Sequence, residues 1–230
     1  MFMPASTPLM IYLTLLSACA ATAHWRRLGD DHRQHAWLGL TVALVLMWSL
    51  PTRVSGIDLH LSGASLAALM FGARLAAISL SVAVGVSGYV SQVAAPELGL
   101  QGIALTLLPA LLTVAIQRLI QSRLPRHIFV YLFAVGFGGT FVANALSVLS
   151  FAWASSMSWA NTPFHVSVLP EDYLAYRLLL CWGEAMLTGM LVAIFVVYRP
   201  RWVSTFRDEV YLAKSIDKRQ PHKTKDKGSR

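Results

Sequence analysis

The residues best suited to bind a ligand in this chain are a few imidazoles and carboxylates. Asp58 and His60 are separated by one residue, His165 follows much later, and Glu184 interrupts an apolar run. Imidazole and carboxylate groups are ligands that suit first-row divalent metals. The spacing of Asp58 and His60 fits a metal site carried on a loop. It fits equally a helix cap beside a hydrogen-bonded histidine, and the sequence leaves both interpretations open.

Glu184 lies within Leu178-Leu-Leu-Cys-Trp-Gly-Glu-Ala-Met, where a carboxylate is costly if the segment crosses lipid. One interpretation is structural: a buried carboxylate, hydrogen-bonded across helices, that holds them in register. The other is functional, with Glu184 helping an ion to move inward. Arg177, two helical turns earlier on nearly the same face, is a candidate partner for the carboxylate.

These residues are carried by apolar stretches at about 8–25, 36–52, 59–73, 75–93, 102–121, 128–155 and 171–198. Each stretch is long enough, or nearly so, to cross about 30 Å of hydrocarbon. With 56% hydrophobic and 13% charged residues, the sequence predicts an all-α, polytopic, multi-pass protein of the cell membrane with about seven transmembrane helices. We expect residues 1–198 to form one integral membrane domain and residues 199–230 a basic, largely disordered tail.

The basic residues predict the orientation of the chain. If the stretches alternate in direction, every Lys and Arg except Arg53 and Arg177 falls on one side of the membrane. The positive-inside bias assigns that side to the cytoplasm, so the N-terminus is expected outside and the C-terminal tail in the cytoplasm. Asp58, His60 and His165 then belong to the outer half.

Charge and motifs argue against two function classes. The net charge of +8 does not indicate nucleic acid, because all five lysines lie at or after Lys214 and the other basic residues flank apolar stretches. Membrane orientation and anionic lipid headgroups explain that pattern. An enzyme is not expected, because Ser87, in a Gly-Val-Ser-Gly motif similar to that of rhomboid proteases, has no histidine in another span as its base.

Cys19 and Cys181 are expected to be unpaired apolar fillers.

Small residues indicate which stretches form the centre of the bundle. They recur at Gly63, Ala64, Ala67 and Ala68 in the third stretch and at Gly85 and Gly88 in the fourth. Small side chains at such spacing let helices approach closely. We therefore expect the third and fourth stretches to form a hairpin of helices at the packed centre.

Two segments carry a resemblance to a known family. The string Gly56-Ile-Asp-Leu-His-Leu-Ser-Gly-Ala-Ser-Leu-Ala-Ala-Leu-Met-Phe-Gly-Ala-Arg74 resembles the signature of the cobalt/nickel energy-coupling-factor permeases, the CbiM-like substrate-binding components. There, a His-Leu-x-Gly-x-x-Leu-Ala type run opens a helix and a glycine turn leads into the next. The segment Gly183-Glu-Ala-Met-Leu-Thr-Gly189 is similar to the family's Gly-Glu-x-x-Ile-Thr-Gly segment.

The resemblance implies a membrane subunit that captures a divalent transition metal outside and releases it inward. A coupling transmembrane subunit and ATP-hydrolysing subunits would be its partners, and the metal would be a substrate rather than a covalently bound cofactor. His60 is the position onto which a family metal ligand carries over. Asp58 would orient it or ligate, His165 would close the site, and Glu184 would hold helices in register or help the ion descend.

One departure from the family pattern defines the alternatives. The family's chelator is an N-terminal Met-His, whereas this sequence starts Met1-Phe-Met-Pro4. The alternative function is therefore a non-transporting membrane accessory or assembly protein that keeps the permease-like bundle without the chelator. A permease for an organic substrate is a third interpretation.

Overall fold

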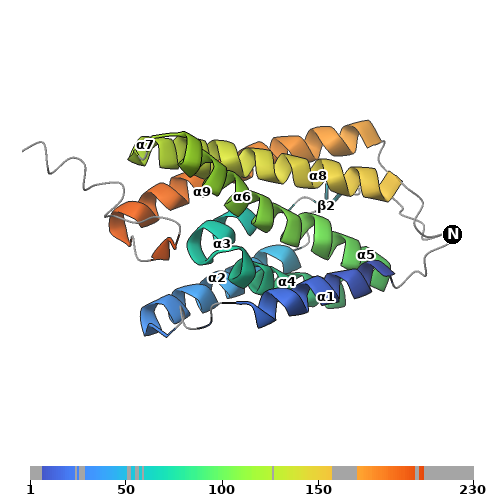
Figure 1. Ribbon diagram of the computed structural model, residues 1–230. Helices are drawn as coiled ribbons and strands as arrows, with labels where there is room; N and C mark the ends of the chain where they lie inside the picture. The colour runs from blue at the N-terminus through green and yellow to red at the C-terminus, as the bar shows by residue number, and fades with distance from the viewer. Residues whose placement is uncertain are drawn as a thin grey trace, which may run out of the picture.

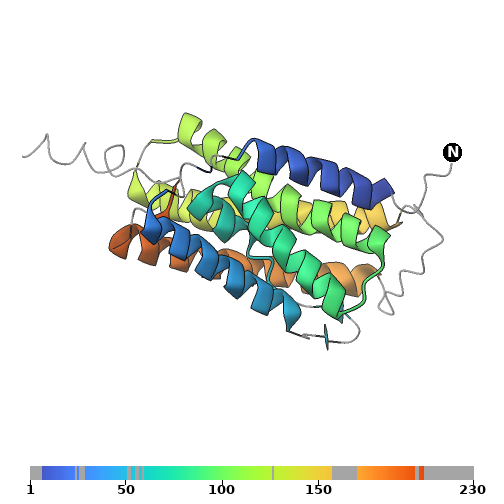
Figure 2. The same cartoon turned by 90° about the horizontal axis from the view of Figure 1, so that it is seen from below.

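The apolar stretches fold into helices that run along one common direction, as Figures 1 and 2 show from two sides. The computed structural model describes residues 7–23, 25, 29–50, 53–54, 57–58, 60–125, 127–156, 170–199 and 202–204. In chain order its elements are α1 (Thr7–Ala21), α2 (Asp31–Ser49), β1 (Arg53–Val54), β2 (Ile57–Asp58), α3 (Ala64–Phe71), α4 (Ala73–Val90), α5 (Ala95–Gln101), η2 (Gly102–Leu107), α6 (Leu108–Arg123), α7 (Ile128–Val130), η3 (Tyr131–Gly139), α8 (Thr140–Ser156) and α9 (Pro170–Tyr198).

The predicted helical class is confirmed for the described residues. The exception among them is a small antiparallel pair of strands, β1 and β2, in which Arg53 lies opposite Asp58. Two of the long helices contain π-helical segments, η2 and η3. The segment η2 ends directly before α6, whose second residue is Pro109. A proline ring clashes with the carbonyl four residues earlier in a regular helix, and the wider π turn accommodates it.

Four described helical stretches are long and apolar enough to cross a membrane: Ala73–Val90, Glu97–Arg123, Ile128–Ala154 and Tyr173–Tyr198. The helix Thr7–Ala21 is apolar but shorter. Four of the expected stretches thus have the length and composition of spans, while the number of actual crossings stays a prediction.

The third expected stretch is not the helix that its apolar residues suggested. We predicted one element over 59–73, but α3 begins only at Ala64 and ends at Phe71. Its 8 residues rise only about 12 Å, so α3 cannot cross a membrane by itself. Glycines with positive φ set both limits, since Gly63 has φ 65° and Gly72 has φ 86°. Hydrophobicity does not mark where a backbone leaves the helical conformation.

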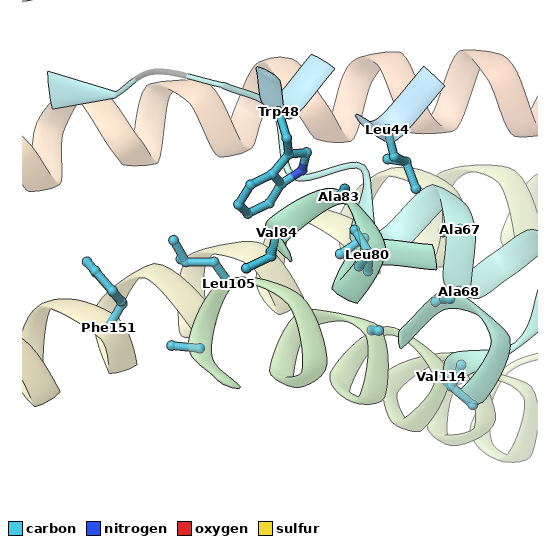
Figure 3. Packing of buried hydrophobic residues seen from close by; sticks show 14 residues of the cluster. Leu44, Trp48, Ala67, Ala68, Leu80, Ala83, Val84, Leu105, Val114 and Phe151 are labelled. Carbon is cyan, nitrogen blue, oxygen red and sulfur yellow. The ribbon is translucent and has the colours of Figure 1, made fainter. Parts of the chain in front are cut away.

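The helix α3 nevertheless lies at the centre of the bundle, as its small residues predicted. Ala64, Ala67 and Ala68 are fully buried, and they share one core cluster with residues of α2, α4 and α6. Figure 3 shows Ala67 and Ala68 near Leu80 in this cluster. Gly88 of α4 likewise allows close packing, because a Cβ at that position would collide with the side chain of Leu98.

The basic connections meet at one end of the bundle, as the alternating pattern predicted. Arg74 Nη1 donates to the Thr22 carbonyl at 2.6 Å, which ties the start of α4 to the end of α1. Ser204 N donates to the Met70 carbonyl at 2.9 Å, so the chain after α9 packs against the end of α3. Val203 is buried in the same region. In Figure 1 this is the end at which α9 and α6 finish.

Replacing Gly63 with alanine is expected to destabilise the bundle. The backbone is left-handed at this residue, and a new Cβ would overlap Leu44 Cδ2 and lie 3.2 Å from Met47 Cε. Left-handed backbone alone costs an L-residue about 1–2 kcal/mol. We expect Gly63→Ala to lower the melting temperature by at least about 3 °C in detergent.

The matched control is Gly85→Ala, because Gly85 lies in α4 and a Cβ added there would have no other atom within 4 Å. It should melt like the wild type. Equal melting temperatures for all three proteins would contradict the assigned role of Gly63.

Candidate functional site

The carboxylate of Glu184 is bound to the start of α3. Its Oε2 accepts from Ser62 N at 2.9 Å, and its Oε1 accepts from Ser62 Oγ at 2.7 Å and from Gly63 N at 2.9 Å. The side chain is 5% exposed. Backbone N–H groups at a helix start have no partner within the helix and favour a negative charge. The hydrogen bonds that the structural interpretation of Glu184 expected are therefore present, and a role of Glu184 in moving an ion stays a prediction.

The proposed pairing of Glu184 with Arg177 is wrong. No ion pair joins the two side chains in the described part of the chain, although both line one cavity. The guanidinium of Arg177 instead lies over the ring of Tyr173, with Cζ 5.5 Å from the ring centroid. Residues seven apart are separated by about 10 Å along a helix, and the donors of α3 reach the carboxylate more directly.

Trp48, at the end of α2, positions the residues that precede α3. Its ring centroid is 4.2 Å from that of His60, with the planes tilted by 58°. Its indole N–H donates to the Ser62 carbonyl at 3.2 Å. Figure 3 shows the indole pointing into the core, toward Val84. One tryptophan therefore fixes both the backbone at Ser62 and the face of the His60 imidazole.

Ser87 is held in the same network and has a structural role. Its hydroxyl donates to the Trp48 carbonyl at 2.8 Å. The hydroxyl thereby satisfies a backbone carbonyl at the end of a neighbouring helix.

A cavity of about 30 Å³ lies between Trp48, His60, Ser62, Asn144, Arg177 and Glu184, together with Leu105, Pro109, Ser147, Val148, Leu180 and Cys181. That volume holds about two water-sized groups. The cavity is bordered by α2, by η2 and α6, by α8 and by α9, so every wall is a long helix except the stretch from His60 to Ser62. Residues far apart in sequence thus meet at one point.

A second polar cluster continues from this cavity into the core. Ser65 Oγ and Thr113 Oγ1 are 2.8 Å apart, and Ser65 Oγ lies 3.3 Å from Asn144 Oδ1. Thr113 Oγ1 also donates to the Pro109 carbonyl at 2.7 Å. Asn144 is 4% exposed, and its Nδ2 has no hydrogen-bond partner in the described structure.

The structure places the four site residues that were named from the sequence in different ways. His60 and Glu184 are brought to one cavity. The backbone of Asp58 belongs to β2, and its side chain is not among those that the structure describes. His165 lies outside the described residues. Among the residues that the structure describes, no group of three or more His, Cys, Asp or Glu side chains could hold a metal ion. Cys19 and Cys181 are unpaired, as expected.

Sequence reasoning missed the contributions of Trp48 and Ser62, and it gave no role to Asn144. A polar amide within an apolar stretch is a usable signal for Asn144. The sequence offered no such signal for Trp48, because a tryptophan near the end of a span is usually an interfacial anchor.

The comparison with protein families adds to this geometry. A family model described as CbiM, cobalt uptake substrate-specific transmembrane region, matches residues 1–202. The chain belongs to this family. It is therefore a multi-pass membrane protein and a transmembrane component of cobalt uptake, from a family of transporter components rather than enzymes. A comparison with curated proteins found no match.

Replacing Glu184 with glutamine tests the contact between α9 and α3. The amide nitrogen of glutamine would face the Ser62 or Gly63 N–H, so one buried donor would lose its acceptor. A buried unsatisfied donor costs about 1–3 kcal/mol. We expect Glu184→Gln to melt several degrees below the wild type in lipid nanodiscs, and Ser62→Ala, which removes a single hydroxyl, to have a smaller effect.

Met190→Leu is the control on the same helix, because Met190 is 57% exposed and lies outside the contact with α3. A Glu184→Gln protein as stable as Met190→Leu would show that the carboxylate does not hold α3.

Proposed function

We propose that this chain is the substrate-capture component of an uptake system for a divalent transition metal of the cobalt or nickel type. The cavity beside Trp48 would hold the ion, and the His60 imidazole would be its principal protein ligand. The observation that carries this proposal is that His60 and Glu184, from the two segments with family motifs, line the same cavity. Imidazole is a preferred ligand for both metals.

The remaining site residues take supporting roles in this proposal. Asp58, two positions before His60, would orient the imidazole or add a carboxylate ligand. His165 would close the site from the connection between α8 and α9. Glu184 keeps its hydrogen bonds to α3 and so sets the depth at which His60 is held. The cation is cargo, and no covalently bound cofactor is needed.

The orientation follows from the positions of the basic residues. The cavity is lined by the end of α2 and the first half of α9, whereas the basic connections lie at the start of α2 and the end of α9. If the basic end faces the cytoplasm, the cavity lies in the outer half. Seven passes then result, with the N-terminus outside, because the stretch before α3 and α3 together make one crossing. Irregular backbone at such depth is tolerated where protein surrounds it.

Partners would bind at the basic end. The family works within a transporter complex, and a coupling transmembrane subunit with ATP-hydrolysing subunits must be reached from the cytoplasmic side. Anionic lipid headgroups would contact the same arginines. The tail 199–230 would extend from this end.

Metal binding by the purified protein tests the role of His60. We expect wild type in nanodiscs to bind Co²⁺ and Ni²⁺, and His60→Ala to lose at least about tenfold in affinity, because one imidazole ligand contributes that much or more. Equilibrium dialysis gives the two dissociation constants directly.

His127→Ala is the matched control, because His127 stacks on Phe129 at the other end of the bundle. Its binding should equal that of the wild type. Absence of binding in every protein, or equal binding in all of them, would remove the capture role of His60. No binding at all would favour an accessory protein that keeps the bundle, an interpretation consistent with the lack of a three-residue metal cluster in the described part.

Reporter fusions test the orientation. An alkaline phosphatase fused after Arg230 should be inactive and a green fluorescent protein at the same place bright, because the tail is expected in the cytoplasm. Active phosphatase there would place the cavity on the cytoplasmic side and contradict uptake.

A further inference from the structure

The chain beyond α9 turns back onto the bundle at residues 202–204, which we call the latch. Trp202 N donates to the Arg199 carbonyl at 2.9 Å, which forms the turn. Ser204 N donates to the Met70 carbonyl, at the end of α3, at 2.9 Å, and Val203 is only 1% exposed. Figure 1 shows the latch in red beside the end of α9. A segment that follows a helix at the edge of a domain is loosely held unless contacts tie it down, and here they do.

The latch completes two core clusters around the second half of α3. Val203 belongs to the cluster that contains Leu69, and Trp202 packs against the cluster of Met70 and Phe71. These three residues of α3 are large and buried, and they are the ones next to its end. Apolar burial stabilises in proportion to the area removed from water. The latch therefore holds α3 by apolar contacts in both clusters as well as by the hydrogen bond from Ser204.

The other attachments of α3 leave it able to move as a unit. Gly63 before it and Gly72 after it both have positive φ, so the helix lies between two bends of the backbone. Residues at the ends of an element absorb the backbone rotation when the element shifts. The buried side chains of its first half are all small, and each buries little apolar area: Ala64, Ser65 and Ala67. The position of α3 thus depends on its polar contacts with Glu184 at one end and on the latch at the other.

We propose that the latch is a conformational switch for the cavity. When the latch is seated, it fixes α3 and therefore the stretch from His60 to Ser62 that forms one wall of the cavity. When the latch leaves the bundle, α3 loses its inner attachment and this wall loosens. The helix has only 8 residues and is about 12 Å long, so a movement at its end reaches its start without being absorbed on the way.

The place of the latch gives this switch a use in uptake, and that use rests on the proposed function. The latch lies at the end of the bundle where the basic connections meet, and the chain continues from it into the basic tail. A partner subunit that binds the tail would pull the latch from α3 and loosen the wall around the ion. A ligand group that its neighbours hold less rigidly binds more weakly, so release of the ion would follow. The cavity then responds to a partner that it does not contact, through the two positions of α3.

Amide hydrogen exchange of the full chain in nanodiscs tests the switch without metal. Ser62 N and Gly63 N exchange only when their hydrogen bonds to Glu184 open. Ser204→Pro removes the N–H that donates to Met70, whereas the matched Ser204→Ala keeps it. We expect the peptide 60–66 to exchange about tenfold faster in Ser204→Pro than in wild type, the effect of losing one hydrogen bond. Ser204→Ala should exchange like the wild type.

A second pair of variants tests the apolar part of the latch and stands even if Ser204→Pro fails to fold. Val203→Ala shortens a side chain that is 1% exposed, and the control Val197→Ala shortens one on α9 that is 68% exposed. Val203→Ala should speed exchange in the peptide 60–66 several-fold, because a smaller side chain leaves part of the core unfilled, and Val197→Ala should not. The amides of α4 should keep their wild-type rates in every variant. Equal acceleration in α4 would show a general loss of stability and overturn the switch.

Cobalt binding separates the switch from the proposed function. We expect Ser204→Pro to bind Co²⁺ several-fold more weakly than Ser204→Ala in equilibrium dialysis, because the wall that carries His60 is looser. Faster exchange at 60–66 in proteins that bind no cobalt supports the switch and overturns the proposed function alone. Wild-type exchange at 60–66 in Ser204→Pro and Val203→Ala, with cobalt bound, overturns the switch alone. Faster exchange with unchanged cobalt affinity overturns the use of the latch in release.

Discussion

The irregular wall of the cavity, from His60 to Ser62, is held by one contact, the carboxylate of Glu184 against the start of α3. An apolar bundle offers no water to backbone donors, so Ser62 N and Gly63 N must find acceptors inside the protein. Ala64, the first residue of α3, is fully buried, so the first turn of α3 begins in the interior of the bundle. A carboxylate is the strongest acceptor for such donors and matches the helix dipole. The same polar residue that appears costly in lipid thus allows an irregular backbone segment inside the bundle.

A second layer of contacts turns this irregular segment into a rigid wall. The indole of Trp48 reaches both the Ser62 carbonyl and the His60 ring, and the Trp48 carbonyl is itself held by Ser87. The helices α2 and α9 therefore hold the stretch from His60 to Gly63 directly, and α4 supports it through Trp48. A ligand group is effective only when its neighbours fix its rotamer, and here the neighbours lie on long helices. This explains how an imidazole outside regular structure has a defined place.

Sequence reasoning predicted the properties that depend on composition and periodicity. The apolar stretches, the shared end of the basic connections, the packed small residues of α3 and the hydrogen-bonded state of Glu184 are of this kind. It failed where a long-range contact decides. The start of α3 at Ala64 depends on the left-handed backbone of Gly63 and on an acceptor that is 121 residues away in sequence. Pairing Glu184 with Arg177 was wrong for the same reason, because helical spacing alone does not reveal the competing donors from another element.

The helix α9 also connects the cavity with the opposite end of the bundle. At the start of α3, Glu184 accepts the hydrogen bonds of Ser62 and Gly63, and at its end the Met70 carbonyl accepts from Ser204, just beyond α9. The short helix is thus attached at both ends to one continuous part of the chain. Moving α3 along α9 would break polar contacts at both ends, and at the buried start of α3 no water can replace them. Because the cavity lies at the first attachment and the basic connections lie at the second, a change in the position of α3 at one end must be accompanied by a change at the other.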